Sequence, residues 1–353
     1  MALLGYFRWA FFFTILGVFL GGIVGWLETG SVVGFFKYFF ICCTLGILEI
    51  SLSFDNSIIN ARVLGEMNQL WRRRFLTWGI LVAVFGMRII FPLLVVAFAS
   101  WINPIAAIKL AIWESHQYAA ILTDAHMGIA AFGGTFLMMV GLRYFFDPEK
   151  NVHWLAFIER PVQKLGSLVG IDIAIILVLI LFFSELIGTE SQLTFLFASL
   201  YGLLTFIVVE AIGSLLDSSK TALFAVAKGG AGSFLYLEIL DASFSFDGVV
   251  GAFAFSHNLF IIAIGLGIGA FYVRAMTIML VETKTLLHYR YLEHGAFYAI
   301  LILAVIMYMQ TIMPISEALT GLIGICIIGI ALYSSIRFKR NQQDTHFASN
   351  KVI

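Results

Sequence analysis

Charged residues are scarce in this chain. Lys, Arg, Asp and Glu make up 12% of its 353 residues, whereas they make up about 25% of a typical soluble protein. Hydrophobic residues make up 61%, and the mean hydropathy is +0.99. The charges are also balanced, with 21 basic and 21 acidic residues, so neither sign favours nucleic acid or an acidic partner. This composition excludes an ordinary soluble domain and predicts a polytopic membrane protein.

Cysteine is nearly absent as well. The three cysteines, Cys42, Cys43 and Cys326, lie in apolar segments and form neither a CxxC pair nor a cluster with histidine. We therefore expect small buried hydrophobic residues rather than a thiolate metal site. A Walker A pattern is also missing, which argues against direct coupling to ATP. The first apolar run, near Trp9, lacks a strongly basic leader and an A-x-A site, so we interpret it as a retained helix.

Long apolar segments predict an all-α membrane protein that spans a lipid bilayer about ten times. A spanning helix needs roughly 20 apolar residues. Placing the N-terminus in the cytoplasm leaves only Lys37 and Lys109 outside and Arg88 and Arg274 within spans, with the rest of the 21 basic residues inside. Both termini are therefore expected to be cytoplasmic, with 100–127 and 148–167 as amphipathic connectors. The expected spans are 9–27, 36–60, 75–99, 128–147, 168–188, 192–213, 230–256, 258–280, 295–314 and 317–336.

Two of these spans contain the same acidic pattern. ILEISLSFDNSIINA (47–61) aligns with EILDASFSFDGVVGA (238–252). Glu49 lies six residues before Asp55, and Asp241 lies six residues before Asp247. Acidic residues close to the centre of two matched spans predict one shared site.

The similarity continues into the following spans. GILVAVFGMRIIFP (79–92) resembles LGIGAFYVRAMTIM (266–279), which aligns Arg88 with Arg274. Spans 2–4 and 7–9 thus form two three-helix units, and their offset of five spans gives them opposite directions. Such inverted repeats are typical of transporters, with the binding site near the midplane. We expect repeat A at about 36–147, linking helices at about 148–228, repeat B at about 229–314, and a C-terminal helix at about 317–337 followed by a cytoplasmic tail.

The intramembrane acids predict a cation site. An ionised carboxylate at the bilayer centre costs on the order of 2.5–3.5 kcal/mol unless it meets a cation, a proton or another group in a wet cavity. Buried ion pairs are the structural alternative, with Arg88 and Arg274 as possible counter-ions. Carboxylate, amide and carbonyl oxygens favour Mn²⁺, Mg²⁺ or Ca²⁺ over Cu⁺ or Zn²⁺. The predicted metal ligands are Glu49, Asp55, Asn56, Asp241 and Asp247, with Glu238 as a possible extension.

The second acid of each copy is the first residue of a turn-prone pair. These pairs are Asp55–Asn56 and Asp247–Gly248. We expect both helices to be interrupted there, so that free carbonyl groups can join the carboxylates as ligands.

The motifs E-x-S-L-S-F-D-N at 49–56 and D-A-S-F-S-F-D at 241–247 resemble those of the TerC family of integral membrane proteins. The similarity covers roughly 40–310 and is to the longer bacterial branch of that family, a domain of unknown function. It implies a bacterial cytoplasmic membrane and a divalent-metal role, with Mn²⁺ export as the leading theme. It also assigns the motif acids and Asn56 to the metal. Gly248 departs from the shorter members, which commonly have serine there.

Together these observations predict a secondary transporter, not an enzyme, that exports a divalent cation by alternating access, with protons as the exchanged ion. A membrane assembly or stress-resistance factor is a second hypothesis. An intramembrane aspartyl hydrolase, with paired aspartates activating water, is a third. A receptor-like sensor also stays open, although the chain has no extramembrane signalling domain.

Overall fold

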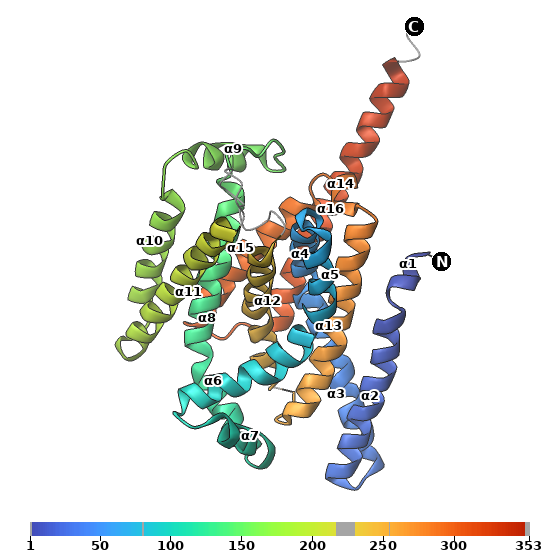
Figure 1. Cartoon of the computed structure of the whole chain (residues 1–353), viewed down its shortest axis with the longest axis vertical. Coiled ribbons are helices and arrows are strands. Elements are labelled where there is room, and N and C mark those ends of the chain that lie inside the picture. Colours follow the sequence, from blue (N-terminus) through green and yellow to red (C-terminus); the bar gives the residue numbers. More distant parts are fainter. Residues whose placement is uncertain (1, 80, 217–229, 254, 350–353) are drawn as a thin grey trace.

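The protein is all-helical in a computed structural model, which describes residues 2–79, 81–216, 230–253 and 255–349 (Figure 1). The described residues contain no β-strand. The helices of the first half are α1 (Ala2–Tyr6), α2 (Arg8–Thr29), α3 (Val32–Leu52), α4 (Phe54–Glu66), α5 (Gln69–Arg74), the π-helices η1 (Phe75–Gly79) and η2 (Val82–Ile90), α6 (Phe91–Ala99), α7 (Pro104–Trp113) and α8 (Ser115–Phe145). Those of the second half are α9 (Ala156–Leu165), α10 (Ile171–Leu186), α11 (Thr189–Leu216), α12 (Ala231–Ala252), α13 (Leu259–Glu282), α14 (Thr285–His288), α15 (Leu292–Gln310) and α16 (Glu317–Ser349).

Helices occupy all ten of the expected spans. Within the described residues, seven helices are long and apolar enough to cross a membrane, or eight if the bent pair Gln69–Gly79 and Val82–Phe98 is one span. Two further helices at expected spans are not among these seven. The helix α10 has only 16 residues, and α12 carries three acidic residues. The chain is therefore a multi-pass helical membrane protein. The last helix, α16, continues beyond the expected boundary at 337.

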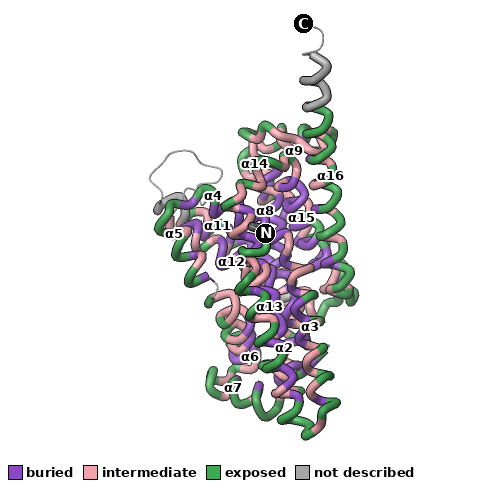
Figure 2. The backbone as a smooth tube through the Cα atoms, turned by 90° about the vertical axis from the view of Figure 1, so that its right-hand side faces the viewer, coloured by how far each residue is buried: buried purple, intermediate pink, exposed green. Residues whose placement is uncertain are grey.

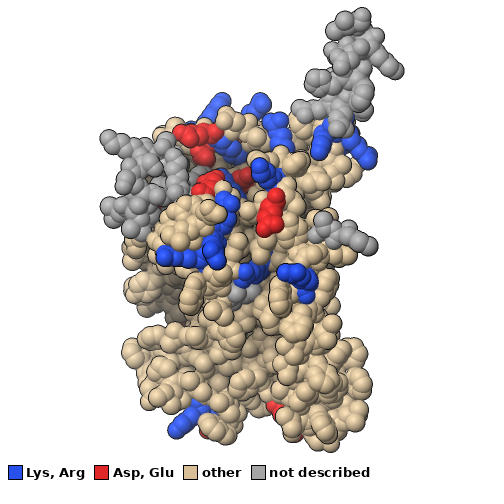
Figure 3. Space-filling view, turned by 45° about the vertical axis from the view of Figure 1, so that its right-hand side comes forward, with Lys and Arg blue, Asp and Glu red and all other residues tan. Residues whose placement is uncertain are grey.

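Charged side chains gather at one end of the molecule. On the face drawn in Figure 3, the Lys, Arg, Asp and Glu side chains gather toward the end that carries α9 and α14 in Figure 1, with a largely uncharged surface below and a few charges at the opposite edge. Large exposed hydrophobic residues cover α2, α10, α11 and α16. An uncharged apolar belt with charges beyond it is the surface that a bilayer requires.

The central helices are α8, α13 and α15, which are the most buried of the long helices (Figure 2). The rings of Tyr144 on α8 and Phe297 on α15 stack with their centroids 3.8 Å apart. Thr135 Oγ1 and Tyr308 OH, also on α8 and α15, share a hydrogen bond of 2.6 Å. A buried hydroxyl pair of this kind satisfies both polar groups inside the bundle.

The first of the two connectors contains more helix than expected. The segment 100–127 is not a plain loop, because it contains α7 and the first turns of α8. Asn103 begins α7 by accepting a hydrogen bond from the Ala106 N–H at 2.7 Å, and Pro104 occupies the first helical position. These start signals were visible in the sequence.

The second span is interrupted at Ser53, two residues before the expected break. Ser53 has φ −105° and ψ 15° and separates α3 from α4. The Asn56 N–H, released from the helical ladder by this kink, donates instead to Asp55 Oδ1 at 2.9 Å. The matching prediction for span 7 is wrong, because α12 runs without a break through Asp247 and Gly248. Helix packing thus overrides the turn preference of Asp-Gly there.

Candidate metal site

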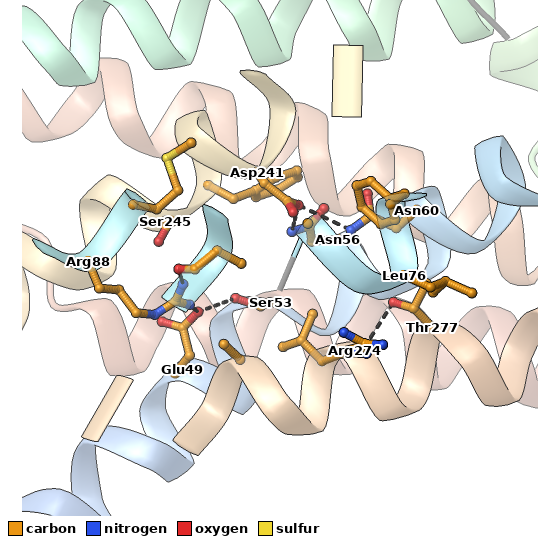
Figure 4. A pocket seen from close by; sticks show the side chains of 17 residues that line it. Glu49, Ser53, Asn56, Asn60, Leu76, Arg88, Asp241, Ser245, Arg274 and Thr277 are labelled. Carbon is orange, nitrogen blue, oxygen red and sulfur yellow. Dashed lines mark hydrogen bonds and ion pairs between the residues drawn. The ribbon is translucent and has the colours of Figure 1, made fainter. Parts of the chain in front are cut away.

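A polar cavity of about 50 Å³ lies between α3, α4, the π-helical span, α12 and α13 (Figure 4). Its polar lining has two ends. Asp241, Asn56 and Asn60 lie at one end, and Glu49, Arg88 and Ser245 lie at the other. The volume exceeds the roughly 10–15 Å³ that one water molecule needs. The complete lining is Glu49, Ser53, Asn56, Asn60, Phe75, Leu76, Gly79, Ala83, Met87, Arg88, Asp241, Phe244, Ser245, Ala270, Val273, Arg274 and Thr277.

Asp241 is held by two amides from α4. Asn56 Nδ2 donates to Asp241 Oδ1 at 2.6 Å, and Asn60 Nδ2 donates to the same oxygen at 3.1 Å. Asn56 and Asn60 are one helical turn apart, so both reach the carboxylate from one face of α4.

Several buried side-chain oxygens on α4 and α12 have no hydrogen-bond partner among the described residues. They are Oδ1 of Asn56, Oδ1 of Asn60, Oγ of Ser245 and both carboxylate oxygens of Glu238. Glu238 lies one turn before Asp241 and faces Gly79 of η1, whose hypothetical Cβ would lie 3.3 Å from Glu238 Oε1. Buried polar atoms without partners are uncommon in native proteins. Asn56, Asn60 and Ser245 line the cavity together with Asp241, and their oxygens are of the kind that a hard cation prefers, whereas Glu238 is not among the lining residues.

Glu49 and Arg88 form a buried ion pair at the other end. Arg88 Nη2 on η2 donates to Glu49 Oε1 on α3, and Ser53 Oγ donates to the same oxygen at 3.0 Å. Both side chains are nearly inaccessible, at 2% exposed for Glu49 and 3% for Arg88. A buried pair of this kind is costly to break, because either charge alone would be left in an apolar interior.

Two glycines make room for Glu49. A Cβ on Gly248 of α12 would lie 3.2 Å from Glu49 Oε2, and one on Gly269 of α13 would overlap with Glu49 Cβ. The absence of a side chain at these two positions lets α12 and α13 close around the carboxylate.

Arg274 lines the same cavity from α13, beside Thr277 (Figure 4). No carboxylate of the described residues lies within ion-pair distance of Arg274. The two arginines that align in the sequence thus reach one cavity, but only Arg88 is paired with an acid there.

Asp55 does not reach this cavity. It lines a separate space of about 10 Å³ between α3, α4, α15 and α16, together with Ser51, Thr320 and apolar side chains. Successive helical residues point about 100° apart, so Asp55 and Asn56 face different neighbours. The structure therefore separates the two adjacent residues that the sequence assigned to one site.

Asp247 lies on α12, but its side chain is outside the described residues. Within the described part of the chain, no group of three or more His, Cys, Asp and Glu side chains is placed to hold a metal ion. A cation at Asp241 would therefore need amide and hydroxyl ligands as well as carboxylates.

Sequence reasoning missed Ser53, Asn60 and Ser245. A signal was present: Glu49, Ser53, Asn56 and Asn60 follow the spacing i, i+4, i+7 and i+11, which is one face of a helix. On α12, Glu238, Asp241 and Ser245 follow the same rule. A search for polar stripes in apolar helices would have found both faces.

Comparison with known proteins identifies the family. No curated protein and no solved structure matches the chain. One family, described as "Protein of unknown function (DUF475)", matches residues 54–342. This range includes α4, the π-helical span, α12 and α13, and it begins after Glu49. Since the match covers most of the 353 residues, the chain belongs to the DUF475 family.

Proposed function

We propose that this protein is a secondary transporter that exports a divalent cation, with Mn²⁺ first among the candidates, in exchange for protons. The observation that carries the proposal is the unpartnered amide and hydroxyl oxygens of Asn56, Asn60 and Ser245, which line one cavity with the Asp241 carboxylate. Oxygen ligands suit Mn²⁺, Mg²⁺ and Ca²⁺, whereas Zn²⁺ and Cu⁺ prefer nitrogen or sulfur. No cysteine or histidine lines the described cavity.

The packing of the helices supports inverted repeats. The first span of each unit packs on the second and third spans of the other unit. In the first unit, α3 and α4 pack on α13 and α15, and in the second unit, α12 packs on η2 and α8. The third members of the two units, α8 and α15, pack on each other. This is the pattern expected of two units related by a twofold axis, with the cavity at their interface.

The two ends of the cavity support alternating access. Asn60 lies near the charged end of the molecule, since it shortly precedes Arg62, which pairs with Glu293. By the distribution of basic residues, we assign this end to the cytoplasm, and thus both termini to the inside of a bacterial cytoplasmic membrane. A cation would enter at Asp241 from the cytoplasm, and the Glu49–Arg88 pair would close the path to the outside. Separation of the Glu49–Arg88 pair would then open the path to the outside and complete the transport cycle.

Membership of the TerC family is part of this proposal, and it rests on the paired acidic motifs. The described aspartates lend no support to a hydrolase dyad, because Asp55 and Asp241 line different cavities. An assembly factor would differ from a transporter in one measurable respect, since only a transporter moves the metal without other proteins.

Ion flux into proteoliposomes tests the proposal. The purified protein should carry Mn²⁺ faster than protein-free liposomes, with Ca²⁺ and Mg²⁺ as competitors and Zn²⁺ as a poor substrate. An imposed pH gradient should change the rate of Mn²⁺ flux. Purified protein that moves none of these ions under either condition would overturn the proposal and favour the assembly factor.

A further inference from the structure

We propose that His116 and His257 form a binding site for Zn²⁺, or for another divalent ion that prefers imidazole ligands. The two rings lie with their centroids 4.4 Å apart and their planes tilted by 48°. His116 is in the first turn of α8, and His257 is in the connection between α12 and α13. The site is separate from the cation cavity, which no histidine of the described residues lines. Its existence does not depend on the proposed function.

Buried packing brings the two segments together. Tyr118, two residues after His116, is fully buried. Its ring centroid lies 5.9 Å from that of Phe253, which directly follows α12 and is also buried. His257 comes four residues later in the chain. The histidines therefore meet because the interior beneath them is packed.

Hydrogen bonds hold the residues around His257. Asn258 Oδ1 accepts a hydrogen bond from the Phe260 N–H at the start of α13, at 2.8 Å, and Asn258 Nδ2 donates to Glu28 of α2. On the other side of His257, Ser256 Oγ accepts a hydrogen bond from the Asn258 N–H at 3.2 Å. A ligand on a backbone that is already held loses less freedom when an ion binds.

The separation of the two rings fits one shared ion. With Zn–N distances of about 2.0–2.1 Å and tetrahedral geometry, two coordinating imidazoles have their centroids about 5 Å apart. The observed 4.4 Å is close to this value, and both side chains are exposed, so a small rotation of either ring reaches it. A tilt of 48° is neither a parallel stack nor an edge-to-face contact. Preferred ring packing thus does not account for the pair.

The surroundings admit an ion that keeps water ligands. The two histidines line a hollow of about 610 Å³ between α2, α3, α7 and α13, and its charged residues are Glu28 and Lys37, one of each sign. Within the described residues, no third His, Cys, Asp or Glu completes a metal-binding group. Water from the hollow therefore fills the remaining positions. Imidazole nitrogen favours Zn²⁺, Cu²⁺ and Ni²⁺ over Mn²⁺, Mg²⁺ and Ca²⁺.

An ion at this site would tie the two three-helix units together. His116 lies in the expected first unit, 36–147, and His257 lies in the second, 229–314. The helix α7, which leads into α8, is at the end of the molecule opposite α9 and α14 (Figure 1), the end that we assign to the outside. Opening there requires the units to part, so a bridging ion should slow Mn²⁺ flux. This consequence, unlike the binding itself, rests on the proposed function.

Titration of the purified protein with Zn²⁺ in detergent tests the site. His116→Ala and His257→Ala should each weaken Zn²⁺ binding by at least about tenfold, because even a residue that only orients a metal ligand commonly contributes that much. The double variant should bind only slightly more weakly than either single variant, because one ion uses both rings. The control is His288→Ala, which removes an exposed histidine from α14 at the other end. Asp241→Asn should bind Zn²⁺ as the parent does.

His257→Gln keeps a polar side chain of similar size and should lose Zn²⁺ binding in the same way, which covers the case in which the alanine variant does not fold. Equal Zn²⁺ affinity in the parent and in the folded His116 and His257 variants would overturn the site. Loss of the binding in Asp241→Asn would overturn it too, because it would place the ion in the cation cavity.

Mn²⁺ flux in proteoliposomes with Zn²⁺ on both sides of the membrane tests the bridge between the units. Flux through the parent should fall when Zn²⁺ is added, and flux through His257→Ala should not. Equal inhibition of both proteins would overturn the bridge. A parent protein that moves no Mn²⁺ would overturn the proposed function, whereas the Zn²⁺ titration decides on the histidine site in either case.

Discussion

Asn56 Nδ2 and Asp241 Oδ1 lie 2.6 Å apart and join the two acidic spans across the cavity. The residues are 185 positions apart in the sequence. The contact leaves the Asn56 side-chain oxygen free of a described partner, beside that of Asn60. The amide thus orients the carboxylate with its nitrogen, and its oxygen is the atom that we propose contacts the cation.

Asn56→Ala should weaken Mn²⁺ binding by about tenfold or more, because residues that orient a metal ligand commonly contribute that much. Asp241 would keep only the longer bond from Asn60. Titration of purified protein with Mn²⁺ measures the change in Kd. Asn103→Ala is the control: it removes the cap of α7, away from the cavity, and should cost stability of about 1 kcal/mol without changing Kd. Equal Kd values for all three proteins would contradict the assignment.

Arg88→Met should destabilise the protein by about 3–5 kcal/mol, because it leaves Glu49 buried and unpaired. The double variant with Glu49→Gln removes both charges and should recover much of this loss. Thermal unfolding in detergent gives the comparison. If the double variant is less stable than Arg88→Met alone, the two residues do not act as a pair in the folded protein.

Gly269→Ala should cost about 1–3 kcal/mol, the range for overpacking a close contact. The new Cβ would overlap with the Glu49 side chain and would displace it. Gly324→Ala on α16 is the matched control, since a Cβ there meets no atom within 4 Å. The control should be neutral or slightly stabilising, because alanine favours a helix over glycine. Unfolding temperatures of the two variants that agree would argue against the tight packing at Glu49.

Acid should lower the stability of the connector 148–167 through Glu159. Burial acts to raise the pKa of Glu159, but hydrogen bonds from Lys150 Nζ and the Leu155 N–H outweigh it, and the pKa is lowered. A folded-state pKa below the unfolded value of about 4.3 means that the stabilisation is fully present above that pH. It is lost as the pH falls toward the folded-state value.

Glu159→Gln should therefore reduce the loss of stability on acidification, as measured by unfolding temperature against pH. Glu149→Gln is the control, because Glu149 is exposed on the same connector. A steep acid limb that persists unchanged in Glu159→Gln would show that other groups cause it.

Hydropathy predicted the positions of the helices, because it follows directly from transfer to the bilayer, although only seven or eight of the described helices qualify as spans by length and composition against about ten predicted. The details of the site did not follow from hydropathy. The Asp55–Asn56 pair suggested a break, and the structure has it at Ser53. Asp247–Gly248 gave the same local signal, yet α12 is continuous and uses Gly248 to approach Glu49. The π-helical turns that place Arg88 leave no recognised sequence signature.

The division between Asp55 and Asn56 depended on tertiary structure. Spacing within one helix shows that the two residues face different directions. It does not say which direction meets α12 and which meets α15 and α16. That information lies in the packing between the two units, which are far apart in the sequence.

Mn²⁺ flux in proteoliposomes of the parent protein and of Asp241→Asn tests the central claim most directly. The parent should carry Mn²⁺ well above protein-free liposomes. Asp241→Asn should fall close to that background while unfolding at a similar temperature, and Glu210→Gln, which alters an acid paired with Arg143 outside the cavity, should keep most of the flux. Parent-level Mn²⁺ flux through folded Asp241→Asn would contradict the account.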